Sequence, residues 1–230
     1  MLTAAALVTL AAAGCGSSSS SGSSEEASSK SPTQLIEAAA TASKGAKSVK
    51  LDVKASGSEA TEVEVVNVPG KGVKGKVNEK GKQAEFIVTG GAFYIKGGEA
   101  LFSQAGSAAG LLSGKWLKIP SGSANLGSFS QISELPNLLN QNLSKLKSKQ
   151  SNLTKTGEKT IDGKTVVGLT GTENGQKGTI YVEAAEPHYP VALESAAAGG
   201  GTVKATFSAW NEPAEVSAPA NAVDLSSLLG

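Results

Sequence analysis

The sequence is poor in the residues on which most catalytic and metal sites depend. Its 230 residues include one cysteine, one histidine, two tryptophans, three tyrosines and five phenylalanines, and every basic residue is a lysine. One cysteine excludes an internal disulfide framework, and one histidine excludes the multi-histidine zinc sites. Without arginine, planar two-point recognition of phosphate, carboxylate or guanine is absent. We therefore expect no metal site and no cofactor.

The charges of the chain nearly cancel. The 21 lysines are matched by 20 aspartates and glutamates, which leaves a formal net charge of +1. A chain with this balance has no long-range field that would attract nucleic acid. We expect no nucleic-acid partner, and charge by itself indicates no other ligand.

An apolar run opens the chain. Residues 1–14 carry no charge and are shorter than the roughly 20 residues that span a bilayer, so they have the length of a signal peptide. The run ends in Ala12-Ala13-Gly14-Cys15, which resembles the lipobox of bacterial lipoproteins, where the cysteine thiol receives a diacylglycerol. We predict that Cys15 carries lipid, with acyl groups such as palmitate; an ordinary thiol is the alternative. No lysine precedes the run, so we expect translation to start upstream.

Residues 15–31 are predicted to form the lipidated cysteine and a flexible tether. The stretch 16–30 is rich in serine and has a single apolar side chain, so it cannot bury much surface. A flexible segment of this length has a typical reach of roughly 20 Å. Because each buried methylene contributes about 0.8 kcal/mol, several acyl chains would hold the protein on a membrane. We expect an exported protein, anchored by lipid to the outer face of the cytoplasmic membrane.

One folded domain is predicted over residues 32–230. Residues 31–45 have a serine N-cap, a proline in the first turn, a capping glutamine and a final glycine, which together predict a helix. From Val49 onward apolar and polar residues alternate, as in a strand with one wet face. Strands are predicted at 49–55, 62–68, 73–78, 83–89, 153–160, 164–172, 178–184, 190–196 and 202–210, with a hairpin turn at Asp162-Gly163. The predicted fold class is α+β, with a single curled antiparallel sheet, because sheets of about nine or ten strands tend to curl.

A second helix is predicted from leucines that share one helical face. They are Leu135, Leu138, Leu139, Leu143 and Leu146, with a proline in the first turn and lysines at the end. Two helices lined with Leu and Ala against a curled sheet enclose an apolar space. The pattern alone leaves open whether this space is an incompletely filled cavity or an ordinary packed core.

Three motifs with catalytic associations fail on their spacing or context. Residues 144–147 and 155–157 match two motifs of penicillin-recognising enzymes, but they lie too close together along the chain. Residues 162–165 resemble the end of a phosphate-binding loop, but the preceding glycine is one position too far away. His188 lies between two prolines, where we expect a surface loop, and no Gly-x-Ser-x-Gly elbow is present. We expect that the protein is not an enzyme.

A series of short segments appears in a characteristic order along nearly the whole chain. They are Leu-Ile-Glu-Ala-Ala at 35–39, Ala-Lys-Ser-Val-Lys-Leu at 46–51, Gly-Ala-Phe-Tyr-Ile at 91–95, Lys-Trp-Leu at 115–117, Thr-Ile-Asp-Gly-Lys at 160–164, Leu-Thr-Gly at 169–171 and Phe-Ser-Ala-Trp-Asn at 207–211. With the lipobox and the tether, they resemble the LppX/LprA/LprF/LprG family of actinobacterial lipoproteins. The resemblance implies a LolA-like fold, a curled half-barrel with helices over its concave face and an apolar cavity between them.

The family resemblance also implies a ligand and partners. Its members bind lipids or acylated glycolipids and help to move them through the cell envelope, so lipid, the membrane and envelope transport proteins are the expected partners. The residues predicted to line the cavity are Leu35, Ile36, Ala39, Leu135, Leu138, Leu139 and Leu143. Leu101, Phe102, Leu111 and Leu112, in a segment rich in Gly and Ala, are predicted to form a flap at the cavity mouth; an inner strand is the alternative.

Two functions are therefore weighed against each other. The first is a membrane-anchored cell-envelope lipoprotein that binds lipid or acylated glycolipid in a hydrophobic cavity and takes part in its transport. The alternative is a tethered protein-interaction or envelope-stress-sensing module of the same fold without lipid cargo, because a fold does not determine a function. A continuous apolar void favours the first, and a filled core with an exposed apolar groove favours the second.

Overall fold

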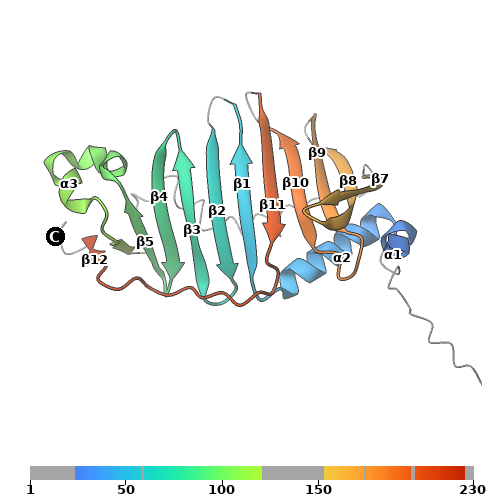
Figure 1. The fold of residues 1–230 in the computed structure, drawn as a ribbon, viewed down its shortest axis with the longest axis horizontal. Helices are drawn as coiled ribbons and strands as arrows, with labels where there is room; N and C mark the ends of the chain where they lie inside the picture. The colour runs from blue at the N-terminus through green and yellow to red at the C-terminus, as the bar shows by residue number, and fades with distance from the viewer. Residues whose placement is uncertain (1–23, 58–59, 121–152, 174, 198–199, 226–230) are drawn as a thin grey trace, which may run out of the picture.

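A single large sheet dominates the protein (Figure 1). The computed structural model describes residues 24–57, 60–120, 153–173, 175–197 and 200–225. The strands are β1 (Val49–Ala55), β2 (Thr61–Val68), β3 (Gly72–Glu79), β4 (Lys82–Thr89), β5 (Ala92–Gly97), β6 (Leu117–Pro120), β7 (Thr154–Ile161), β8 (Lys164–Glu173), β9 (Gln176–Glu183), β10 (Pro190–Ala196), β11 (Thr202–Ser208) and β12 (Val223–Asp224). The helices are α1 (Ser24–Ser29), α2 (Pro32–Gly45), the 3₁₀ helix η1 (Glu99–Ala108) and α3 (Ala109–Leu112).

The sheet is open and mostly antiparallel, as predicted. The spatial order of its 12 strands is β12-β6-β5-β4-β3-β2-β1-β11-β10-β9-β8-β7. Every neighbouring pair is antiparallel except β12 with β6, which is parallel. The edge strands are therefore β12 and β7, and β1 lies in the interior between β2 and β11. The hairpin predicted at Asp162-Gly163 is confirmed, with positive φ angles of 48° and 77°.

The predicted first helix is present with the predicted cap. The backbone N–H of Gln34 donates to the Ser31 hydroxyl at 3.2 Å, and the Ser31 N–H donates to the Gln34 side chain at 2.8 Å. This reciprocal pair satisfies two donors that a helix start leaves unpaired. One face of α2 is fully buried and joins the same apolar core as the sheet; its residues are Leu35, Ile36 and Ala39. The helix therefore covers part of the apolar side of the sheet.

The two faces of the sheet differ in polarity because the strands pair in register. Leu51 lies opposite Val65 and Phe207, so apolar side chains from β2, β1 and β11 share one face. Asp52 lies opposite Glu64, which lies opposite Lys76, so charged side chains share the other face. Successive side chains of a strand point to opposite faces, and this alternation places the core on one side only.

The stretch predicted to be a flexible tether is partly helical. Residues 24–29 form α1, and Ala27 is fully buried in the core. The ammonium group of Lys155 in β7 donates to the carbonyl groups of Ala27, Ser28 and Lys30, at 3.2, 2.6 and 3.0 Å. A cation at the end of a helix satisfies carbonyls that lack a partner within the helix. The composition of the segment does not reveal this contact, because the lysine lies more than 120 residues away in the sequence.

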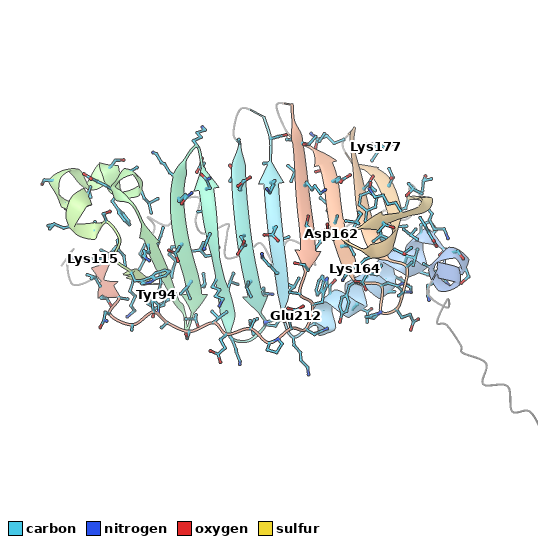
Figure 2. The ribbon with its side chains drawn as sticks, in the orientation of Figure 1. Tyr94, Lys115, Asp162, Lys164, Lys177 and Glu212 are labelled. Atoms are coloured by element: carbon cyan, nitrogen blue, oxygen red, sulfur yellow. The ribbon has the colours of Figure 1, made fainter. Side chains whose placement is uncertain are left out.

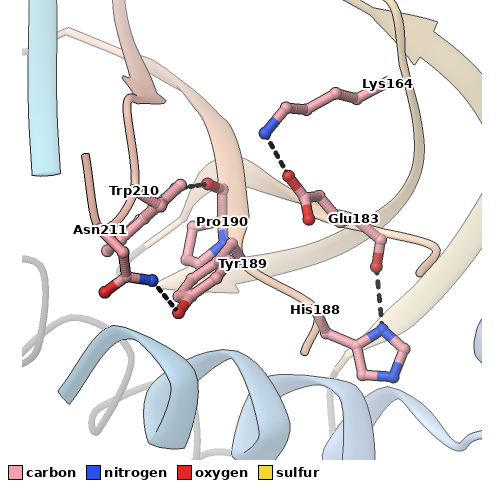
Figure 3. A network of polar contacts seen from close by, with 7 residues as sticks. All are labelled: Lys164, Glu183, His188, Tyr189, Pro190, Trp210 and Asn211. Carbon is pink, nitrogen blue, oxygen red and sulfur yellow. Dashed lines mark hydrogen bonds and ion pairs between the residues drawn. The ribbon is translucent and has the colours of Figure 1, made fainter. Parts of the chain in front are cut away.

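The prediction that His188 lies on the surface is wrong. The side chain is 1% exposed, and its Nδ1 lies 2.9 Å from the carbonyl oxygen of Glu183 (Figure 3). A turn in which the His188 N–H donates to the Ala185 carbonyl, with a φ of 64°, directs the imidazole inward. Among the described residues, no group hydrogen-bonds to Nε2. The flanking Glu186 and Pro187 are exposed, as a loop predicts, while the histidine itself packs inside.

Aromatic stacking fixes the chain where it leaves β11. The rings of Tyr189 and Trp210 are stacked with centroids 4.6 Å apart, and the Trp210 indole donates to the Pro190 carbonyl at 3.0 Å (Figure 3). From there the chain runs along one end of the strands to β12 (Figure 1). The Asn211 N–H donates to the Ser48 carbonyl at 3.0 Å and the Val223 N–H donates to the Trp116 carbonyl at 2.8 Å. The C-terminal segment thus ties β1 to β6.

Gly75 is required because the ring of Phe86 occupies the space that a side chain would need. A Cβ at Gly75 would lie 2.2 Å from the Glu64 carbonyl oxygen and 2.7 Å from Phe86 Cζ. We expect Gly75→Ala to lower the free energy of unfolding by about 1–3 kcal/mol, measured by denaturant titration. Gly157→Ala, in a strand position with nothing within 4 Å of the added atom, is the control and should change stability by at most about 0.5 kcal/mol. Equal effects of the two substitutions would contradict the packing argument.

Lys155 holds α1 against the edge of the sheet. We expect Lys155→Met to leave three carbonyls of the helix end without their cation, and therefore to speed hydrogen exchange of the backbone amides of residues 24–30. The melting temperature should change little, because the remaining strands keep their pairing. Lys177→Met, which removes an exposed lysine of β9, serves as the control. Unchanged exchange in the Lys155 variant would show that the contact does not hold the helix.

Candidate functional site

A hollow of about 710 Å³ lies across β1–β5. Each of the five strands contributes one residue to a row of register partners that lines it, and the row runs Val53, Val63, Val77, Ala84 and Gly97. The lining continues to Ser113 and Gly114 beyond β5. Four inter-strand spacings of about 4.8 Å give this row a length of about 19 Å. That is long enough for an extended acyl chain, and the volume lies in the range of small-molecule sites.

The apolar side of the sheet is incompletely covered along this row. Leu51 and Val65 are 7% and 1% exposed, whereas Val53 and Val63, two positions further along the same face of the same strands, are only half-buried. Helix α2 contributes to the core, but its buried residues do not line the hollow. Covering the exposed part of these two valines would be favourable, because it removes apolar surface from water.

Most of the lining belongs to the charged face of the same strands, because these residues alternate with the apolar row; they are Asp52, Lys54, Glu62, Glu64, Lys76, Asn78, Gln83, Glu85 and Lys96. The lysines and carboxylates among and beside them neutralise one another. Lys50 lies 3.3 Å from a carboxylate oxygen of Glu64 and 3.6 Å from one of Asp52. The pairs Lys54–Glu62 and Lys96–Glu85 are each 3.3 Å apart. These pairs keep the neighbourhood close to neutral. Burial lowers the pKa of Lys50, but the hydrogen bonds and charges of Glu64 and Asp52 outweigh it and leave this pKa above its ordinary value.

Three of the residues predicted to line the cavity belong to the core of the described structure. Leu35, Ile36 and Ala39 are fully buried in the core and are not among the residues that line the hollow. Leu135, Leu138, Leu139, Leu143 and Cys15 lie outside the described residues. The roles of these residues therefore stay predictions.

The proposed flap residues lie in helices rather than in an inner strand. Leu101 and Phe102 belong to η1, and Leu111 and Leu112 belong to α3. Three of them are half-buried and pack against the core, whereas Leu111 is 70% exposed. The Gly114 N–H donates to the Gly97 carbonyl at 2.8 Å, so the segment leaves the sheet and returns to the same place. Both ends of this segment lie on the lining of the hollow.

The residues that line the hollow were missed because their importance depends on register. The alternation in each strand shows which side chains share a face, but only the pairing brings Val53, Val63 and Val77 into one line. A signal was present in the sequence, because small or β-branched residues stand between charged or amide residues in β1, β2, β3 and β4. Pairing these strands as a meander of hairpins would have produced the row.

The described residues were also compared with the requirements of metal sites and membrane-spanning helices. It contains no cluster of three or more His, Cys, Asp and Glu residues able to hold a metal ion. No helix within it is both long and apolar enough to cross a membrane. The lining contains neither His nor Cys, and its polar members are Lys, Asp, Glu, Asn, Gln and Ser.

Known proteins share the fold but little sequence. No protein-family model matches the chain, and no curated protein matches it. Its structure is similar to that of LprF from Mycobacterium bovis, with a TM-score of 0.58, 19% identity, and coverage of 83% of this chain and 97% of LprF. It is also similar to the lipoprotein LppX of Mycobacterium tuberculosis, with a TM-score of 0.53, 22% identity, and coverage of 81% of this chain and 98% of LppX. The protein therefore has an LppX/LprF-like, LolA-like fold.

The ion pairs of Lys50 predict a pH dependence at the alkaline end. Because the folded pKa of Lys50 lies above the ordinary 10.5, its contribution to stability is present below that pH and is lost as the pH rises through the folded pKa. We expect Lys50→Met to lower the melting temperature at neutral pH by an amount equivalent to less than about 1 kcal/mol, because the side chain is partly screened by water. This difference from wild type should shrink as the pH rises past 10.5.

Thermal melts of wild type, Lys50→Met and Lys177→Met across this pH range provide the measurement. The Lys177 variant controls for the loss of one lysine on the surface. A difference for Lys50→Met that grows with pH would contradict the assigned direction of the pKa change.

Proposed function

We propose, from the fold shared with LprF and LppX, that this protein binds lipid in the hollow across β1–β5 and takes part in lipid transport in the cell envelope. The observation that carries the proposal is a pair of half-buried apolar side chains, Val53 and Val63, at one end of a row that lines a 710 Å³ hollow together with charged and amide side chains of the other face of the sheet. An ordinary core would cover these side chains. A carrier keeps them uncovered until its ligand arrives.

The binding energy would come from the hydrophobic effect. Covering roughly 200 Å² of acyl-chain surface contributes about 5 kcal/mol at about 25 cal/mol per Å², before the cost of ordering the chain is subtracted. A binding free energy of this size allows the lipid to be both loaded and released without a covalent step. The row from Val53 to Gly97 would contact the acyl chain along its length.

The headgroup would meet lysines, hydroxyls and backbone groups. No arginine is present in the sequence, so a phosphate or sugar would be held by groups such as Ser113 and, on the charged face of the sheet, Lys76 and Asn78. These groups form single, adaptable hydrogen bonds, which suit a polyhydroxylated sugar as well as a phosphate. An acylated glycolipid is the cargo that combines such a headgroup with the apolar row.

The N-terminal region would attach the carrier to a membrane. Cys15 is the predicted site of lipidation, and α1, held to β7 by Lys155, is the point at which the chain enters the folded domain. The expected location is the outer face of the cytoplasmic membrane, after removal of a signal peptide over residues 1–14. Envelope transport proteins would load or unload the cargo.

A binding function without catalysis also fits the single histidine. The Nδ1 of His188 is engaged by the Glu183 carbonyl, and the side chain is buried away from the lining of the hollow. It therefore has no role as a general base at this site. The alternative function, a tethered interaction or stress-sensing module without cargo, is favoured by the outer edge of β7, which pairs with no other described strand and is exposed over most of its length.

Blocking the hollow should abolish lipid loading. We expect Val63→Trp to fill the trough with an indole and to reduce the amount of lipid that copurifies, because the acyl chain and the indole compete for the same space. Native mass spectrometry of the full chain, purified from cells with abundant envelope lipid, followed by extraction and lipid identification, provides the measurement.

Val66→Trp is the matched control for this test. Val66 is also half-buried in β2, but it lies opposite Lys74, on the charged face of the sheet. Its replacement should leave the copurified lipid unchanged. If wild type carries no lipid even after incubation with envelope lipids, the carrier function is wrong and the interaction module becomes the better proposal. If both variants keep their lipid, the ligand lies elsewhere than the row.

A further inference from the structure

The charged face of β1–β5 carries two rows of polar register partners, which we name the polar rows. The first runs Asp52, Glu64, Lys76, Glu85 and Lys96, and the second runs Lys54, Glu62, Asn78 and Gln83. Four inter-strand spacings of about 4.8 Å make the first row about 19 Å long. Because side chains alternate along each strand, the polar rows lie on the side of the sheet opposite the valines. They form a surface with its own chemistry.

Three neighbouring members of the polar rows have unused hydrogen-bonding groups. Within the described residues, the side chains of Lys76, Asn78 and Gln83 take part in no hydrogen bond and no ion pair. Asn78 lies directly opposite Gln83, and Lys76 stands two residues before Asn78 on the same face. An amide offers a carbonyl acceptor and two N–H donors, and an ammonium group offers three donors. Donors and acceptors are therefore available side by side on a surface that lines the hollow.

The charges of the lining disfavour an ionic ligand. The lining holds three lysines and four carboxylates, so an anion meets no net attraction. Each of the four carboxylates already has a lysine ammonium group within 3.6 Å, so a cation meets partners that are in use. A carboxylate nevertheless keeps acceptor sites beside such a partner. A neutral ligand with many hydroxyls fits this arrangement, because each hydroxyl donates to one group and accepts from its neighbour.

An indole lies at the β5 end of the first polar row. The ring of Trp116, which directly precedes β6, is half-buried, and the Lys96 ammonium group lies 5.8 Å from its centroid. A sugar ring presents apolar C–H groups on its face and hydroxyls at its edge, so it packs on an aromatic surface while the edge bonds to polar groups. Protein interfaces are depleted of Lys, Glu and Asp, which dominate the polar rows. The surface therefore suits a sugar better than a protein.

We infer that the charged face of β1–β5 binds a neutral oligosaccharide, a linear glycan without lipid that lies across the strands along the polar rows with one end at Trp116. A free glycan needs the charged face alone, so this inference does not rest on the proposed lipid carriage. The protein would hold a glycan on one face of the sheet and its lipid on the other. The two ligands would then be separated by the main chain of the sheet.

The inference is tested by NMR titration of the full chain with two neutral hexasaccharides, one of glucose and one of N-acetylglucosamine. We expect saturable shifts of the backbone amides of β1–β5 with at least one of them. The double variant Asn78→Ala, Gln83→Ala should bind about tenfold more weakly, because two hydrogen-bonding side chains are lost from an otherwise unchanged surface. Gln176→Ala is the matched control and should bind as wild type does. Gln176 begins β9 next to Lys177, three strands beyond β1 (Figure 2).

The outcomes separate this inference from the proposed function. No saturable shift with either hexasaccharide overturns it, and so does equal binding by the double variant and wild type. Binding of an acylated sugar but of neither free hexasaccharide also overturns it, because the sugar then belongs to the lipid cargo. Val63→Trp, on the apolar face, should keep its glycan affinity while it loses lipid. A chain that binds glycan but never carries lipid retains this inference and loses the carrier function.

Discussion

The pairing of β1 with both β2 and β11 is the constraint on which the rest of the structure depends. Strands β2–β6 lie within residues 61–120 and β7–β11 within residues 154–208, and β1 is the only described strand that pairs with both groups. Its register places Leu51 opposite Val65 on one side and Phe207 on the other. A slip of one residue in either pairing would turn the apolar residues of half the sheet toward water. The register of β1 with its two neighbours therefore determines the positions of the core, the charged face and the hollow.

This register also places partly exposed apolar side chains next to the buried core. Within the described part of the chain, α2 brings three fully buried residues to the core of the 12-stranded sheet, and α1, η1 and α3 add Ala27, Leu101, Phe102 and Leu112. Along β1 and β2 the exposure rises from Leu51 and Val65 to Val53 and Val63. The exposed surface of the valines costs stability in the empty state, and a bound acyl chain would recover it. A sheet that completed its own core would have no such affinity.

Local patterns in the sequence predicted local structure well. The capping box of α2, the hairpin at Asp162-Gly163 and the strands with alternating residues are all present, because each depends on residues close together in the chain. The open antiparallel sheet followed from the number of such strands. Features set by distant contacts were missed. Lys155 orders α1, and a turn buries His188, although composition indicated a coil and a surface loop.

The candidate site lies between these two cases. Each strand shows in sequence which of its residues face the core, but the line from Val53 to Gly97 exists only when five strands are in register. Sequence reasoning placed the cavity lining on helices, because leucines at helical spacing are conspicuous and a row of single residues from separate strands is not. A lipid site built on a sheet is thus harder to predict from sequence than one built on a helix.

The chemistry of the lining bears on selectivity. Its cations are lysines paired with carboxylates, and the pairs Lys54–Glu62 and Lys96–Glu85 leave little net charge to distinguish one anionic headgroup from another. The apolar row, in contrast, has a defined length and ends at Gly97, where the Leu101 side chain occupies the space above the backbone. A site of this kind distinguishes its ligands mainly by the length and shape of the acyl chain, since each methylene that fits contributes about 0.8 kcal/mol. The headgroup then determines orientation more than affinity.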